Sequence, residues 1–186
     1  MKQSKKILIA NRGVIAIRAL RAARELGYSV ASVYSTVDRD QKHLKLSDEA
    51  ICIGPPETKD SYLNEAAIIS AAELSGADAI YPGFGFLAEN ASFAEKCRES
   101  GFKFIGPDPE VIAIMGDKIK AKELAKSLNI PVVPGYEGEI STENEAIKIV
   151  EEIGYPVIIK ASAGGGGRGM RVVNSESELK QGLISS

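Results

Sequence analysis

The stretch KILIANRGVIAIRALRAARELG, from Lys6 to Gly27, contains a short apolar run, a polar turn and a longer segment with apolar residues at helical spacing. The run KILIA predicts a strand, and the segment from Val14 to Leu26 predicts a helix that ends just before Gly27. A buried strand that leads through a short turn into an amphipathic helix is typical of α/β folds. The stretch therefore predicts an α/β architecture for the N-terminal part of the chain.

The same alternation of strand and helix recurs along the chain. Predicted strands cover 29–34, 50–54, 77–83 and 102–106, and predicted helices cover about 64–74 and 91–100. Strands that are apolar on both faces and alternate with helices indicate a mostly parallel, Rossmann-like sheet with both faces covered. Ligands of such sheets bind beyond the carboxyl ends of the strands. The polar turns at 11–13 and 82–90 follow two strands and are the first candidates for a site.

The alternation of predicted strands and helices stops after Gly106. Two helices separated at Gly116 are expected, and the prolines and glycine of PVVPGY, 131–136, mark a boundary. The second part is predicted to contain a helix over 142–153, strands over 155–161 and 170–173, and a final helix. Ser175 is a plausible N-cap of that helix, with Glu178 at capping-box spacing. Since the sequence stops inside this helix, we expect it to be a piece of a longer protein.

Composition and charge exclude several classes of function. The chain has 23 basic and 25 acidic residues and no basic stripe interleaved with aromatic residues, so no nucleic-acid partner is expected. No apolar run approaches the roughly 20 residues of a membrane span, and the N-terminus turns polar too soon for a signal peptide. We expect a cytoplasmic protein without a membrane partner.

The sequence lacks the residue spacings of a metal site and of a nicotinamide-binding turn. Cys52, Cys97 and the single histidine, His43, have no metal-ligand or disulfide spacing, so no metal site is predicted within the sequence. The turn after the first strand lacks G-x-G-x-x-G, which argues against a nicotinamide cofactor.

The glycine-rich stretch KASAGGGGRGMRVV, from Lys160 to Val173, connects two predicted strands. It has more glycines than a hairpin turn needs. Consecutive bare backbone N–H groups can wrap a phosphate, and a lysine at the strand end supplies a positive charge. The stretch is not a Walker A loop, because GK[ST] is absent. It is interpreted as a flap over nucleoside triphosphate phosphates, with a flexible linker as the alternative.

Seven motifs in order resemble one family. They are IANRGVIAIRALRAARELG, DEAICIG, SYLNEAAIISAA, YPGFGFLAENASFA, FIGP, MGDK and IGYPVIIKASAGGGGRGMRVV. Together they resemble the N-terminal part of biotin carboxylase, the ATP-grasp component of acetyl-CoA, pyruvate and related carboxylases. The resemblance implies a pre-ATP-grasp domain over 1–114, a helical linker over 115–130, and the start of an ATP-grasp domain over 131–186.

The resemblance also implies roles for individual residues. ATP would contact Lys118, Ile158, Lys160, Gly164, Gly165, Gly166, Gly167 and Met170. Gly85 would meet the biotin ureido ring and Glu89 would shape its loop, although a structural turn explains both equally well. Lys118 on its own reads as an exposed helix lysine. Arg21 and Glu25 match a homodimer contact, and their spacing also allows a weak ion pair within one helix.

The implied chemistry consumes ATP and bicarbonate, with magnesium, to form carboxyphosphate and then to carboxylate biotin. The implied partners are a biotin carboxyl carrier protein or domain, a carboxyltransferase subunit and a second copy of the complete protein. In the family, the magnesium carboxylates, the bicarbonate-binding residues and the arginine that stabilises enolised biotin lie beyond residue 186. No catalytic residue is therefore expected within this sequence, and the piece alone is expected to be inactive.

Three departures from the family pattern stand at the predicted site. Val14 replaces a glutamate that the family usually has in NRGEIA, and Tyr81 and Phe84 change the frequent HPGYGF. A carboxylate in the first helical turn interacts favourably with the helix dipole, so its loss bears on activity. Two alternatives stay open: another ATP-grasp ligase that joins carbon to nitrogen, and a truncated module without catalysis.

Overall fold

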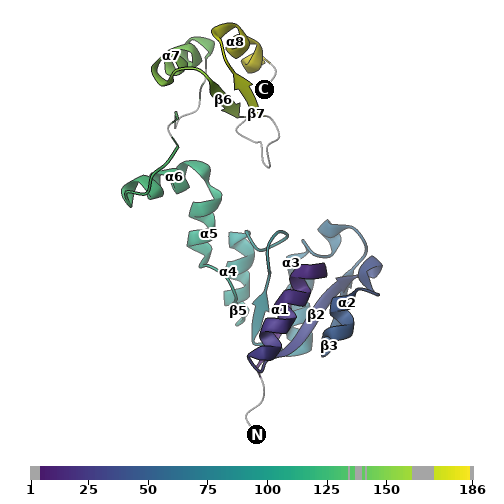
Figure 1. Cartoon of the computed structure of the whole chain (residues 1–186). Helices are drawn as coiled ribbons and strands as arrows, with labels where there is room; N and C mark the ends of the chain where they lie inside the picture. Colours follow the sequence, from purple (N-terminus) through teal and green to yellow (C-terminus); the bar gives the residue numbers. More distant parts are fainter. Residues whose placement is uncertain (1–4, 134, 137–139, 141, 161–169, 185–186) are drawn as a thin grey trace. The chain divides into compact units, whose positions relative to one another are not determined.

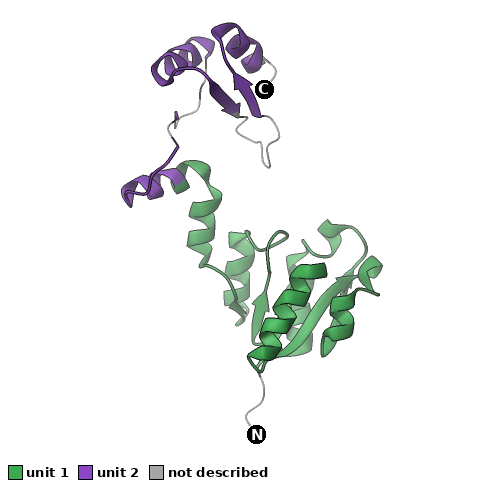
Figure 2. Cartoon of the chain, in the orientation of Figure 1, with its two compact units in different colours: residues 1–121 green, residues 122–186 purple. Residues whose placement is uncertain are grey.

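The structure is a computed structural model that describes residues 5–133, 135–136, 140, 142–160 and 170–184. The chain forms two compact units, residues 1–121 and 122–186 (Figure 2). Each unit has its own sheet and its own hydrophobic core.

The first unit contains a five-stranded sheet (Figure 1). Its strands are β1 (Lys6–Ile9), β2 (Ser29–Ser35), β3 (Glu49–Gly54), β4 (Ala79–Tyr81) and β5 (Lys103–Phe104). They lie in the order β3-β2-β1-β4-β5, and every neighbouring pair is parallel. The predicted parallel α/β architecture is confirmed.

Helices connect the strands of the first unit. They are α1 (Gly13–Glu25), α2 (Lys42–Leu46), α3 (Glu65–Ser75), α4 (Ala91–Glu99) and α5 (Pro109–Gly116), with single 3₁₀ turns at Thr36–Asp38 and Thr58–Asp60. Helix α6 (Lys118–Ser127) follows and crosses the division between the units. The sequence did not predict α2, because five residues are too few for a helical period to be recognised.

Neighbouring residues of the central strand face opposite sides of the sheet. Leu8 belongs to a core with Ile68 of α3 and Phe93 of α4, whereas Ile9 packs with Leu20 of α1. Such alternation is the rule for strands, and apolar residues at consecutive positions therefore indicate burial on both faces. Strands β1 and β4 are parallel neighbours, so their carboxyl ends lie side by side at one edge of the sheet.

The second unit is an antiparallel hairpin with two helices. Strands β6 (Val157–Lys160) and β7 (Met170–Val173) pair with Lys160 opposite Met170, and helices α7 (Glu143–Ile153) and α8 (Glu176–Ile184) complete the unit. Its core contains Ala146, Val150, Val173 and Leu179. The predicted strands and helices of this part are confirmed.

The predicted start of α8 is found with one difference in detail. The Ser175 hydroxyl accepts the Glu178 backbone N–H at 3.4 Å. The Glu178 carboxylate accepts the N–H of Asn174 at 2.8 Å, one residue earlier than in a standard capping box. No helix in the described part of the chain is long and apolar enough to cross a membrane.

Candidate functional site

The two polar turns at the carboxyl ends of β1 and β4 are joined by one buried side chain. The Nδ2 group of Asn11 donates to the carbonyl oxygens of Pro82, at 2.7 Å, and Phe84, at 3.0 Å. Its Oδ1 atom accepts the Arg12 backbone N–H at 2.9 Å. Asn11 therefore holds the turn before α1 against the loop after β4. The sequence pattern indicated each of these two segments as a candidate for a site.

Two glycines of the loop after β4 have positive φ for different structural reasons. Gly83 has φ +70°, and a Cβ there would lie 2.6 Å from the Cγ2 atom of Ile15 and 2.9 Å from Asn11 Nδ2. Gly85 has φ +68°, but a Cβ there would meet nothing within 4 Å. The backbone of Gly85 is therefore open to the approach of a ligand, whereas Gly83 is enclosed.

A hollow of about 380 Å³ lies between these two turns. It is lined by Asn11, Arg12, Gly13, Val14, Ile15, Gln41, Phe84, Gly85 and Phe86. The first turn of α1 contains no acidic residue, and Val14 there is 70% exposed. With Phe84 also 61% exposed, the rim is apolar, and Arg12 supplies the positive charge of the hollow.

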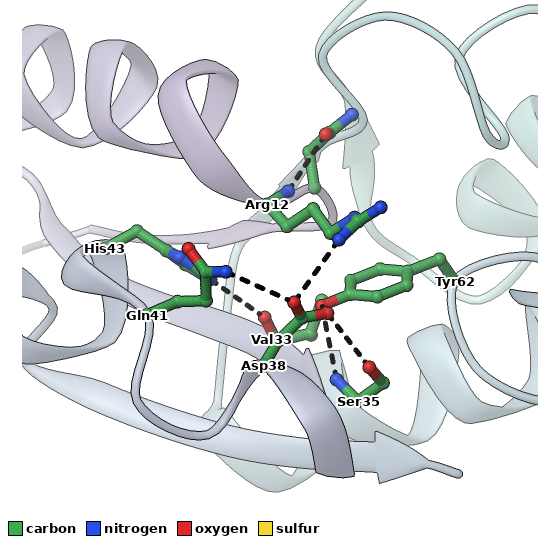
Figure 3. A network of polar contacts seen from close by, with 8 residues as sticks. Arg12, Val33, Ser35, Asp38, Gln41, His43 and Tyr62 are labelled. Carbon is green, nitrogen blue, oxygen red and sulfur yellow. Dashed lines mark hydrogen bonds and ion pairs between the residues drawn. The ribbon is translucent and has the colours of Figure 1, made fainter. Parts of the chain in front are cut away.

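A polar network supports one side of this hollow (Figure 3). The Asp38 carboxylate accepts hydrogen bonds from Tyr62 Oη at 2.7 Å, Ser35 Oγ at 2.9 Å and Arg12 Nη1 at 3.3 Å. Gln41 Nε2 lies 3.5 Å from the same carboxylate. The side chain of Asp38 is only 4% exposed, so these donors replace the water that a carboxylate would otherwise bind.

The network sets the protonation of its members. Burial by itself would raise the pKa of Asp38, but the bonds from Tyr62 and Ser35 and the charge of Arg12 outweigh it and hold the pKa below its usual range. Burial, followed by the hydrogen bond to Asp38, raises the pKa of Tyr62. Asp38 is therefore a carboxylate and Tyr62 a neutral phenol near neutral pH.

His43, from α2, lies beside the network. Its side chain is fully buried, its Nε2 atom lies 3.4 Å from the Val33 carbonyl, and its Nδ1 atom has no hydrogen-bond partner among the described residues. Burial lowers the pKa of His43, against smaller opposing effects of Val33 and Asp38. The imidazole is therefore neutral and structural.

A larger hollow, of about 640 Å³, lies on the face of the sheet beside α1. Its walls run from Lys6, Asp78 and Lys103, at the amino ends of three strands, to Tyr81 and Phe84 at the carboxyl end of β4. Ligand sites of parallel sheets lie at the carboxyl ends. The smaller hollow lies at that end and includes the open backbone of Gly85, so it is the stronger candidate for a ligand site.

The hairpin of the second unit exposes an apolar face. Ile158 is paired with Val172, and the three side chains of Ile158, Met170 and Val172 are 56%, 51% and 57% exposed. The neighbouring residues Val157 and Ile159 pack on the core instead. The structure thus brings the predicted adenine neighbours Ile158 and Met170 onto one open surface, with the backbone of Lys160 opposite Met170.

The other predicted site residues that the structure describes lie on α1, on α6 and in the loop after β4. Lys118 is exposed at the start of α6, where the Asp117 carboxylate accepts the next two backbone N–H groups. Arg21 and Glu25 are exposed on α1 and form no ion pair with each other, and Glu89 is exposed in the loop after β4. Gly164, Gly165, Gly166 and Gly167 lie outside the described residues. Within the described ranges, no group of three or more metal-ligating side chains occurs.

Sequence reasoning missed Asp38, Tyr62 and Val172, and it indicated the turn at 11–13 without giving Arg12 a role. Arg12 and Asp38 follow the carboxyl ends of β1 and β2, so the convergence of parallel strands was a usable signal for both. Val172 alternates with Met170 in a strand, which also predicts a shared face. Tyr62 follows a 3₁₀ turn and gave no comparable signal.

Comparison with known proteins gives a consistent result for both units. The family described as "Biotin carboxylase, N-terminal domain" matches residues 3–112, and "Carbamoyl-phosphate synthase L chain, ATP binding domain" matches residues 117–186. The biotin carboxylase of Pseudomonas aeruginosa is 58% identical over 175 residues, which cover 94% of this chain and 39% of that protein.

Solved structures agree with the sequence relatives. A biotin carboxylase from Campylobacter jejuni, solved as a β,γ-ATP complex, has a TM-score of 0.91 and 52% identity over 97% of this chain and 41% of that one. The biotin carboxylase domain dimer of Hydrogenobacter thermophilus 2-oxoglutarate carboxylase, solved with MgADP, ADP and bicarbonate, has a TM-score of 0.88 and 47% identity. It matches all of this chain and 41% of its own.

The parallel α/β sheet, and the hairpin within a segment that matches an ATP-binding domain, agree with the ATP-grasp class of proteins. Within that class, the chain belongs to the biotin carboxylase family. It spans about two fifths of the length of the curated relatives that it matches.

Proposed function

We propose that this chain forms the N-terminal part of a biotin carboxylase, an ATP-dependent ligase that carboxylates biotin on a carrier protein. The observation that carries the proposal is the 58% identity to a biotin carboxylase over nearly the whole chain. The exposed apolar face of β6 and β7 adds support, because an adenine ring binds on such a surface. The ATP-binding match at residues 117–186 covers the same hairpin.

In the proposed reaction, ATP phosphorylates bicarbonate to carboxyphosphate, which breaks down to phosphate and carbon dioxide. The released phosphate takes the proton of the biotin ureido N–H, and the nitrogen then bonds to the carbon of carbon dioxide. Lys118 and Lys160 would neutralise phosphate charge, with the amides of 164–167 around the phosphates, and Ile158 and Met170 would flank adenine. Positioning and charge neutralisation are the main sources of catalysis in phosphoryl transfer.

The loop after β4 would contact biotin in this proposal. The backbone of Gly85 is open on the side where a Cβ would stand, which allows close approach of a ureido ring. Glu89 would shape the same loop. The apolar rim made by Val14 and Phe84 replaces the more polar rim of the usual family pattern.

The described residues do not fit magnesium, since they contain no group of three or more suitable ligands. As the family resemblance implies, we propose that residues beyond position 186 hold magnesium. The division into 1–114, 115–130 and 131–186 is also proposed; the compact units divide at 121, inside α6.

The proposed assembly contains a carrier protein or domain, a carboxyltransferase and a second copy of the complete protein. Arg21 and Glu25 support a dimer contact through α1, because both are exposed on that helix. The Hydrogenobacter thermophilus relative was solved as a dimer. We propose a cytoplasmic location, as expected from the sequence.

The test is phosphate release by the complete protein with ATP, magnesium and bicarbonate. We expect release to rise with added free biotin and not with ammonia or amines. Release that depends on ammonia and ignores biotin would contradict the proposal and favour a ligase of the carbamoyl-phosphate type.

A further inference from the structure

The loop after β4 contains a residue in an unfavourable backbone conformation. Phe86 has φ +44°, in the left-handed region that side chains other than glycine rarely adopt. Such a conformation persists only where its surroundings determine it. Phe86 follows Gly85 directly, so whatever holds Phe86 also fixes the Gly85 backbone.

Two aromatic and cationic contacts hold Phe86. Its ring stacks on Tyr62, with centroids 4.9 Å apart and planes 12° apart. The guanidinium carbon of Arg12 lies 6.0 Å from the Phe86 centroid and 5.8 Å from that of Tyr62, within the range of a cation–π contact. Tyr62 and Arg12 thus contact Phe86 from elements distant in sequence.

Both of these side chains are positioned by one carboxylate. Asp38 accepts the Tyr62 hydroxyl at 2.7 Å and Arg12 Nη1 at 3.3 Å (Figure 3). Tyr62 Oη in turn accepts the Ser35 backbone N–H at 3.2 Å, which ties the ring to the end of β2. Asp38 is buried, so its bonds to these donors are not exchanged with water.

We infer that Asp38 is a positioning residue: it orients Arg12 and Tyr62 so that they clamp Phe86 and hold the Gly85 backbone in the shape that biotin requires. The inference rests on the proposed function for its ligand, whereas the clamp itself rests on the geometry. Asp38 acts through other residues and does not border the hollow.

Hydrogen exchange on the 186-residue chain tests the clamp without any ligand. Asp38→Asn keeps the size of the side chain and removes its charge. We expect the amides of 83–88 to exchange faster, and that of Ala88, which donates to the Gly85 carbonyl at 2.9 Å, to exchange about tenfold faster, because a hydrogen bond to a charged group contributes roughly that factor. The matched control is Asp48→Asn, whose carboxylate accepts the Val30 N–H at 2.8 Å and pairs with Arg24. It should leave these amides unchanged.

A milder substitution distinguishes local loss of the clamp from unfolding of the whole unit. Tyr62→Phe keeps the stacked ring and removes only the hydroxyl, so it should raise exchange at 83–88 by less than Asp38→Asn does, while the amides of α4 stay protected. Unchanged exchange of 83–88 in Asp38→Asn, or an equal rise in Asp48→Asn, would overturn the clamp.

Kinetics of the complete protein test the link to biotin. Asp38→Asn should raise KM for free biotin by roughly tenfold to a hundredfold, since displacement of positioned groups by about 1 Å can cost up to that much, and leave KM for ATP unchanged. Equal rises in both constants would overturn the positioning role. Absence of biotin-dependent phosphate release in the unsubstituted protein would refute the proposed function alone, and the exchange measurement would still decide the clamp.

Discussion

At the scale of single residues, two neighbouring glycines make different demands on the fold. Gly83→Ala adds a methyl group within 3 Å of two side-chain atoms and places it at positive φ, whereas Gly85→Ala meets only the unfavourable φ. We expect Gly83→Ala to lower the free energy of unfolding by about 3 kcal/mol and Gly85→Ala by about 1 kcal/mol. Urea denaturation measures both, and equal losses would contradict the described packing.

His43 predicts a pH dependence of stability. Its pKa in the folded protein is lowered from 6.5 by burial, so the unfolded chain binds a proton more readily. The stabilisation is complete above pH 6.5 and is lost as pH falls through the folded pKa. His43 is the single histidine, and the neighbouring Asp38 is held ionised to lower pH.

Urea denaturation of the chain at pH 7.5 and 5.5 checks this expectation. His43→Gln should be less stable at both pH values but should show a much smaller difference between them. A variant with the same pH dependence as the unsubstituted chain would show that another group is responsible.

At the scale of elements, two adjacent residues of β6 are expected to have different roles: Ile159 stabilises the fold and Ile158 contacts ATP. Ile159 packs on the core of the second unit, so Ile159→Ala should cost about 2 kcal/mol of stability. Ile158 is exposed, so Ile158→Ala should keep stability and weaken ATP binding about fivefold through lost apolar contact. Denaturation and nucleotide titration of both variants check this, and an unstable Ile158→Ala would contradict the described face.

The regular elements were predictable from sequence because their apolar patterns are long. The strand and helix of 6–26 and the hairpin around the glycine run follow from periodicity and turn residues. The short helix α2 was not predictable, because five residues are too few for a helical period to be recognised. The sequence pattern predicted that the two polar turns lie at the same end of the sheet. It did not predict the clamp on Phe86, because the side chains that contact one another there are 24 to 74 residues apart in sequence.

At the scale of the whole molecule, we propose that the chain supplies only part of an ATP site. Within the described residues, no group of three or more side chains exists that could hold magnesium. The family resemblance implies that the magnesium ligands lie beyond residue 186, and phosphoryl transfer depends on groups that are held in position. We therefore expect the 186-residue chain to bind ATP weakly and to release no phosphate in response to biotin.

Titration of the isolated 186-residue chain with ATP, at low and at physiological salt, tests this central claim most directly. The account predicts weak binding that falls as salt rises, because exposed charges dominate it. Lys160→Ala should weaken binding further, while Lys148→Ala, an exposed lysine on α7, should not. Tight binding that is insensitive to salt, or equal losses in the two variants, would contradict the assignment of the phosphate site to Lys160.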